Sequence, residues 1–194
     1  MQMKTHLKFV GLLLLAITFL SCKKNKIEIP VKPVYIQYFN ANIAGKDLNI
    51  KGSLGENRGV FRGSWTVLGY GKGTDKDLYR VDVAIPNRIS NSSSAQLSFQ
   101  IFDIEQKPYT ISSARAYLES FSSNIYLIVK SSTSSDVYTT SELKKPFVVN
   151  ITKYEKPKNG SSPFVGGKID GVLYNTKNLQ DSIVIRDGVF EVRF

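Results

Sequence analysis

Three stretches of the chain alternate between apolar and polar residues, which is the pattern of a β-strand with one buried face. These stretches are residues 78–85, 95–102 and 147–154. The polar positions of the first stretch include Arg80 and Asp82, and those of the second include Ser98 and Gln100. The alternation predicts that the apolar residues pack on a core while these four side chains point the other way.

Three further stretches favour strands by composition, because they are rich in β-branched and aromatic residues. They are residues 35–43, 59–70 and 124–130. Between the predicted strands lie clusters of glycine, serine, asparagine and proline, which are typical of turns and loops. The clusters occupy residues 71–77, 86–94, 131–136 and 156–163.

The last fourteen residues favour a β-hairpin. Asp187 and Gly188 lie between two β-prone runs. An Asp-Gly pair is preferred in a type I′ turn, because both central residues of that turn need positive φ. We therefore predict a C-terminal hairpin with strands near residues 182–186 and 189–194.

One segment, residues 112–121, combines serines that could cap a helix with good helix formers, so a short helix is an alternative to a strand there. Everywhere else after residue 34 the signals are short strands separated by turns. This spacing predicts an all-β fold, an antiparallel β-sandwich or open barrel with the C-terminal hairpin. We expect residues 34–194 to form a single β-rich domain.

The N-terminus has the features of a secretory signal. Residues 1–8 carry two lysines, and residues 9–20 are apolar throughout. A helix needs roughly 20 apolar residues to cross a bilayer, so this run is too short to span and suits the core of a signal peptide. We predict a signal peptide over residues 1–21. The segment 22–33 that follows is charged and contains two prolines, and is predicted to be an extended tether.

The signal ends in Phe-Leu-Ser-Cys, which resembles the bacterial lipobox. In that motif a small residue, here Ser21, precedes the cysteine that is acylated and becomes the new N-terminus, here Cys22. Several acyl chains anchor a protein firmly, since each buried methylene contributes about 0.8 kcal/mol. Lys23 and Lys24 stand where acidic residues would retain such a protein at the inner membrane. The resemblance therefore implies an outer-membrane lipoprotein, with the periplasmic and cell-surface faces both open.

The net charge of the chain indicates which classes of partner it favours. Lysine and arginine number 26 against 16 acidic residues, which gives a net charge of +10. Removing residues 1–21 with Lys4 and Lys8 would leave +8. This excess favours anionic glycans, lipid headgroups or another acidic envelope component. The compartment argues against nucleic acid. The alternative is that the scattered lysines form a solvated surface without a specific partner.

Short motifs resemble a family of small β-rich lipoproteins of the Bacteroidetes. The motifs are FNANIAG (39–45), PYTI (108–111), NITKYE (150–155), GGKIDGVLYN (166–175) and IVIRDGVFEVRF (183–194). They cover most of the chain after the tether. The resemblance is to a domain family of unknown function, so it implies location and fold and supplies no catalytic residue.

The chemistry available to the secreted chain is limited. The single histidine, His6, lies in the predicted signal peptide, and the single cysteine is Cys22. Without a histidine, a Ser-His-Asp or Cys-His mechanism has no base. The usual zinc ligands are missing as well. We therefore predict no catalytic residue, no metal, no cofactor and no enzymatic activity.

Carboxylates leave one enzymatic alternative, because glycoside hydrolases use two acids roughly 5–10 Å apart. Acids that are close in sequence are Asp75 with Asp77, Asp103 with Glu105, and Asp187 with Glu191. Nothing in their pattern separates them from ordinary surface charges. A carboxylate-dependent glycoside hydrolase is therefore the second alternative.

The aromatic residues favour binding instead. The chain has 10 tyrosines, 11 phenylalanines and one tryptophan, and aromatic rings stack on the apolar faces of sugars. Trp65 and Tyr70, beside a glycine-rich turn, are the candidate stacking pair, and the other interpretation is that Trp65 belongs to the core. The leading hypothesis is a lipid-anchored, non-enzymatic binding or structural module of unknown ligand. A glycan-binding accessory module is the first alternative.

Overall fold

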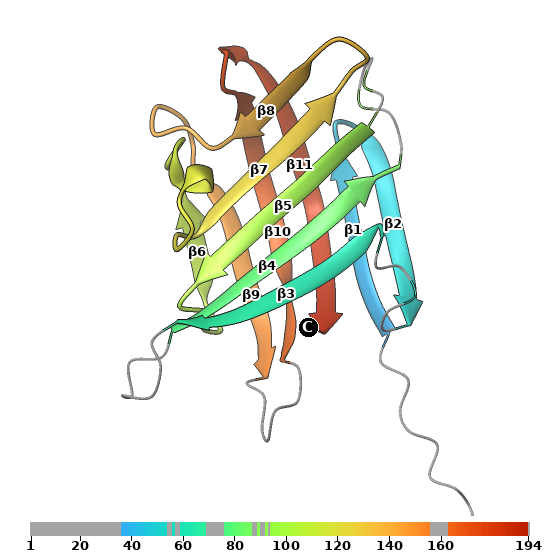
Figure 1. The fold of residues 1–194 in the computed structure, drawn as a ribbon, viewed down its shortest axis with the longest axis vertical. Coiled ribbons are helices and arrows are strands. Elements are labelled where there is room, and N and C mark those ends of the chain that lie inside the picture. Colours follow the sequence, from blue (N-terminus) through green and yellow to red (C-terminus); the bar gives the residue numbers. More distant parts are fainter. Residues whose placement is uncertain are drawn as a thin grey trace, which may run out of the picture. The chain divides into compact units, whose positions relative to one another are not determined.

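The residues that the structure describes form one antiparallel sheet of eleven strands (Figure 1). The computed structural model describes residues 36–53, 56, 59–68, 76–86, 89, 92, 94–155 and 163–193. The strands are β1 (Ile36–Ile43), β2 (Lys46–Ser53), β3 (Phe61–Leu68), β4 (Lys76–Ile85), β5 (Ser94–Phe102), β6 (Pro108–Ile111), β7 (Asn124–Lys130), β8 (Ser135–Thr139), β9 (Phe147–Glu155), β10 (Phe164–Asn175) and β11 (Asn178–Arg193). The predicted all-β class is confirmed.

The sheet branches at β10. Its main path runs β2-β1-β11-β10-β8-β7-β5-β4-β3. Strand β9 also pairs with β10, along Phe164–Asp170, and carries β6 on its other edge. Of the residues of β10, only Tyr174 and Asn175 pair with β8. Strands β8 and β9 thus share one edge of β10. The sheet curls into a half-barrel, with β3, β4, β5 and β7 lying across β9, β10, β11 and β1 in the view of Figure 1.

The core fills the concave side of this curl. Three aromatic pairs join strands that are not neighbours in the sheet: Phe39 with Phe61, Phe99 with Phe190, and Tyr79 with Tyr154. Their ring centroids lie 5.0–6.0 Å apart, which is the contact range for aromatic rings. The alternation predicted for residues 78–85, 95–102 and 147–154 is confirmed, because the apolar residues at every second position are among the buried core residues: Tyr79, Val81, Val83, Ile85, Leu97, Phe99, Ile101, Phe147, Val149 and Ile151.

The prediction of a hairpin turn at Asp187 and Gly188 is wrong. Strand β11 runs through both residues, and the C-terminal hairpin is formed by β10 and β11 around the turn at residues 176–177. Asp187 does adopt a positive φ of 53°, but in a β-bulge. At this point the three residues Arg186 to Gly188 of β11 lie opposite only two residues of β10 on one side and only two residues of β1 on the other. A bulge accommodates one left-handed residue, whereas the predicted turn needs two.

The segment 112–121 is neither helix nor strand. It belongs to a loop between β6 and β7 that contains one short 3-10 turn, Ala116–Leu118. Strand β2 was not expected from the sequence. Among the residues that the structure describes, no helix is long and apolar enough to cross a membrane.

Candidate functional site

Polar side chains form two rows across the outer face of strands β3, β4, β5 and β7. Pairing between neighbouring strands places Arg62, Asp82, Ser98 and Tyr126 in one row. The next row contains Arg80, Gln100 and Asn124. Side chains of one row point to the same side of the sheet and lie within contact distance of each other. The register therefore gathers residues distant in sequence into one polar cluster.

Asp82 is the centre of this cluster and is almost fully buried, with a relative exposure of 8%. Its Oδ1 accepts hydrogen bonds from Ser98 Oγ at 2.5 Å and Arg80 Nε at 3.1 Å. Its Oδ2 lies 3.5 Å from Arg62 Nε. A buried carboxylate is stable only with such partners, so Asp82 fixes the position of the arginines around it.

Arg80 is held on two sides. Besides its bond to Asp82, its Nη2 donates a 2.7 Å hydrogen bond to the Tyr126 hydroxyl. Burial alone would lower the pKa of Arg80, but the Asp82 carboxylate and Tyr126 raise it above its ordinary value. Two of the five N–H donors of the guanidinium are used in these bonds. The others have no protein partner among the described residues, so Arg80 can donate to a ligand.

The loop 112–123 covers part of this face and is tied to it by hydrogen bonds. Gln100 Nε2 donates to the backbone carbonyls of Ser120 and Ser122 at 3.1 and 2.8 Å. Asn124 Nδ2 donates to the Ala116 carbonyl at 3.2 Å. Gln100 and Asn124 are buried beneath the loop, and their amides satisfy loop carbonyls that would otherwise lack partners. The loop is therefore a fixed wall of the cluster.

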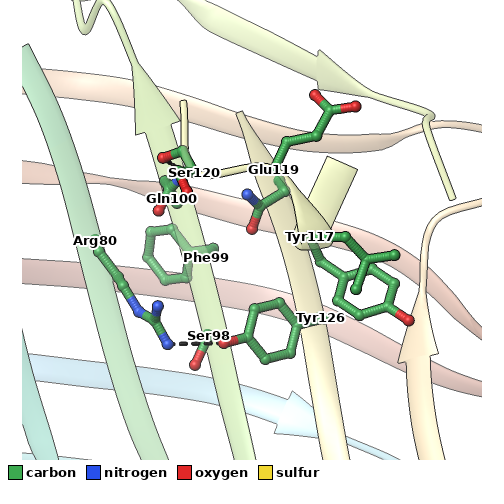
Figure 2. A pocket seen from close by; sticks show the side chains of 10 residues that line it. Arg80, Ser98, Phe99, Gln100, Tyr117, Glu119, Ser120 and Tyr126 are labelled. Carbon is green, nitrogen blue, oxygen red and sulfur yellow. Dashed lines mark hydrogen bonds between the residues drawn. The ribbon is translucent and has the colours of Figure 1, made fainter. Parts of the chain in front are cut away.

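Between this wall and Arg80 lies a pocket of about 170 Å³ (Figure 2). It is lined by Arg80, Ser98, Phe99, Gln100, Tyr117, Leu118, Glu119, Ser120, Asn124 and Tyr126. The rings of Tyr117 and Tyr126 lie 5.6 Å apart at an angle of 47°. Figure 2 shows the guanidinium of Arg80 beside Tyr126, with the carboxylate of Glu119 pointing away from it. The pocket thus combines a cation, two aromatic rings and polar groups.

The predicted stacking residue Trp65 lies elsewhere, on the inner face of β3. It is half-buried against the core, and its indole Nε1 donates a 3.3 Å hydrogen bond to Asp77. Asp77 is buried and also accepts a 2.7 Å hydrogen bond from the Tyr154 hydroxyl. This arrangement matches the alternative interpretation that Trp65 belongs to the core. Tyr70, its predicted partner, lies outside the described residues.

The phenols near Asp77 titrate abnormally because they are buried. Burial, a hydrogen bond and the charge of Asp77 raise the pKa of Tyr154 to about 12. Burial and the neighbouring Tyr154 hydroxyl raise the pKa of Tyr79 far above its ordinary value. Both phenols therefore stay protonated at neutral pH and serve as neutral hydrogen-bonding groups of the core.

Three of the acids that are close in sequence pair with lysines. Asp103 pairs with Lys76 at 3.1 Å, and Glu105 pairs with Lys107. Glu191 lies 3.7 Å from Lys153, while Asp187 is the bulge residue of β11. Asp75 lies outside the described residues. Within the described ranges, no three His, Cys, Asp or Glu side chains are placed to hold a metal ion together.

The signal-peptide and lipidation residues, Ser21 and Cys22 among them, also lie outside the described ranges. Among the pocket residues, Tyr117 and Tyr126 were not singled out from the sequence. Tyr126 sits at an outward position of a predicted strand, opposite Ser98, and strand register was the signal that could have found it. Tyr117 lies in the loop, where the sequence offered no comparable signal.

These features define a class: a curled all-β domain with a small polar and aromatic pocket on its outer face. Residues 36–193 match the family model described as a domain of unknown function, DUF5025. The match spans most of the chain, and the protein belongs to this family. No curated protein and no solved structure gives a significant match.

Proposed function

We propose that the protein is a lipid-anchored, non-enzymatic binding module of the bacterial outer membrane, and that the pocket beside Arg80 is its ligand site. The anchoring part of the proposal is supported by the sequence: a short apolar signal, the lipobox-like end at Ser21 and Cys22, and the lysines after it. The binding part is supported by the geometry of the pocket.

The observation that carries the proposal is the fixed position of Arg80. Its guanidinium is oriented by Asp82 and Tyr126 before any ligand arrives, and it keeps donors directed to no protein group among the described residues. Preorganised donors bind more tightly, because less conformational entropy is lost on binding.

A glycan-binding accessory module is the form of this function that the pocket favours. Tyr117 and Tyr126 provide rings at the pocket wall, as in sites that stack sugars. The predicted stacking residue Trp65 is not part of this site, because its side chain packs against the core.

The proposal is tested by screening the purified full chain, in detergent, on an array of envelope polysaccharides, peptidoglycan fragments and lipids. We expect at least one array member to bind the wild type and not to bind Arg80→Gln. This variant should unfold at a lower temperature, because Arg80 pairs with the buried Asp82, and circular dichroism checks that it is folded at the temperature of the assay. Binding that is unchanged in Arg80→Gln would contradict the assignment of the pocket. Binding to no member would contradict the function as a binding module.

A further inference from the structure

The charges around the pocket select for an anion. Two guanidiniums, Arg62 and Arg80, share the single carboxylate of Asp82, so these three groups carry a net positive charge. Glu119, the acidic residue of the pocket lining, points its carboxylate away from Arg80 (Figure 2). Arginine N–H groups bind planar oxyanions such as carboxylate strongly, through charge-assisted hydrogen bonds.

The aromatic part of the pocket selects for a ring with an apolar face. Tyr117 and Tyr126 are both half-buried and tilted toward each other at 47°. Leu118 lies at the rim with 70% of its surface exposed. Such side chains gain contact energy from a flat apolar surface, while the tyrosine hydroxyls can still bond to polar edges. A small inorganic anion would leave these groups unused.

The size of the pocket limits how much of a ligand it holds. Its volume of about 170 Å³ is below the roughly 300–1,000 Å³ of pockets that enclose drug-sized molecules. It suits one unit of a longer chain, the rest of which would remain outside in solvent.

Taken together, the geometry leads us to propose that this pocket binds an acidic sugar unit of a polysaccharide. The oxyanion of the sugar accepts hydrogen bonds from Arg80, and the sugar ring lies against Tyr117, whose own ring packs on Tyr126. The oxyanion is a carboxylate, as in a hexuronate, or a sulfate. This inference rests on the function proposed above and specifies the ligand class of the same site.

The experiment measures binding of the full chain in detergent by calorimetry to three oligosaccharides: a hexuronate oligomer, a sulfated oligomer, and a neutral oligomer of the same length. We expect one of the acidic oligomers to bind at least about tenfold more tightly than the neutral one, because a hydrogen bond to a charged group is stronger than one between neutral groups. The acidic oligomer that binds identifies the oxyanion.

Variants connect the binding to the pocket. Arg80→Lys keeps the charge and removes the planar fork, so affinity should fall about tenfold, and Tyr117→Ala should lower it as well. Lys177→Gln is the matched control, because Lys177 also pairs with an aspartate, Asp136, at 2.8 Å but does not line the pocket. Its affinity should stay within about threefold of the wild type. Thermal unfolding of each variant checks that it is folded.

Two outcomes overturn the inference in different ways. If the neutral oligomer binds as tightly as the acidic ones and Arg80→Lys weakens it, the acidic-sugar assignment fails but the pocket remains the binding site. If no oligomer binds, the acidic-sugar assignment again fails, and the array of envelope polysaccharides, peptidoglycan fragments and lipids decides separately whether the pocket binds another ligand.

Discussion

At the scale of single residues, Asp82 holds the outer-face cluster together. Replacing it by asparagine keeps the shape but removes the charge that Arg62 and Arg80 share. We expect Asp82→Asn to lower the free energy of unfolding by about 1–3 kcal/mol, the cost of breaking a buried charged hydrogen-bond network. Urea unfolding followed by circular dichroism measures this.

The matched control for Asp82 is Asp103→Asn. Asp103 also pairs with a basic residue, Lys76, but more than half of its side-chain surface is exposed. Solvent screens such a pair, so its loss should cost less than about 1 kcal/mol. Equal losses in the two variants would show that Asp82 is an ordinary surface charge.

Gly167 is a second residue on which the fold depends. It lies in β10 between β9 and β11, and a Cβ there would stand 2.5 Å from the Asn150 carbonyl oxygen and 3.1 Å from the Phe190 ring. Gly167→Ala should therefore destabilise the fold by about 1–3 kcal/mol through overpacking. At Gly59 a Cβ would meet nothing within 4 Å, so Gly59→Ala should change stability by about 0.5 kcal/mol or less. Thermal unfolding compares the two, and a tolerated Gly167→Ala would mean that β9, β10 and β11 are packed more loosely than described.

At the scale of elements, a phenol joins β8 to β11. The Tyr138 hydroxyl donates a 2.6 Å hydrogen bond to Asp181, which also accepts one from Asn175 of β10. Burial first, and then this bond and the charge of Asp181, raise the pKa of Tyr138 to about 12 from an ordinary value of 10.0. The junction of these three strands therefore depends on a protonated tyrosine.

This raised pKa predicts a loss of stability in alkali. Between pH 10 and 12 an unfolded tyrosine has lost its proton while native Tyr138 keeps it, so the native state binds more protons and the free energy of unfolding falls as pH rises. Tyr138→Phe should be less stable at pH 7 but show a shallower decline over pH 10–12. Urea unfolding at several pH values measures both effects. An unchanged slope would contradict the role of this phenol.

The strands with strong alternation could be predicted from the sequence, because burial of every second residue leaves a pattern that is visible within a few neighbouring residues. It also placed Arg80, Asp82, Ser98 and Gln100 on the outer face. It did not show that these side chains are partly or wholly buried, because their partners are distant in sequence: Asp82 is enclosed by side chains of neighbouring strands, and Gln100 by the loop 112–123. That enclosure depends on bonds such as Gln100 to Ser122, which no local pattern encodes.

Local preference also gave the wrong turn near the C-terminus. Asp187 and Gly188 favour positive φ in a hairpin, yet the same tendency of Asp187 is satisfied in a bulge of a strand paired on both edges. Whether a left-handed residue ends a strand or bends it is decided by the neighbouring strands, and the pairing of β11 with both β1 and β10 could not be read from the sequence.

At the scale of the whole molecule, the proposal places the domain at a membrane through Cys22. Cys22→Ser should abolish incorporation of labelled palmitate and move the protein from the membrane fraction to the soluble fraction or to an uncleaved precursor. Ser21→Ala is the matched control, because it keeps a small residue before the cysteine and should remain lipidated. If Cys22→Ser still partitions into detergent like the wild type, the protein is not anchored by lipid at this residue.

The most direct test of the account asks whether Arg80 itself contacts the ligand. The side-chain Nε–H signals of arginine can be followed by nuclear magnetic resonance in the ¹⁵N-labelled full chain in detergent, with Arg80→Lys assigning the signal of Arg80. On titration with a hexuronate oligomer and a sulfated oligomer, the account predicts that one of them shifts the Arg80 signal saturably and shifts that of Arg62 less. An Arg80 signal that stays fixed at saturating concentrations of both would contradict it.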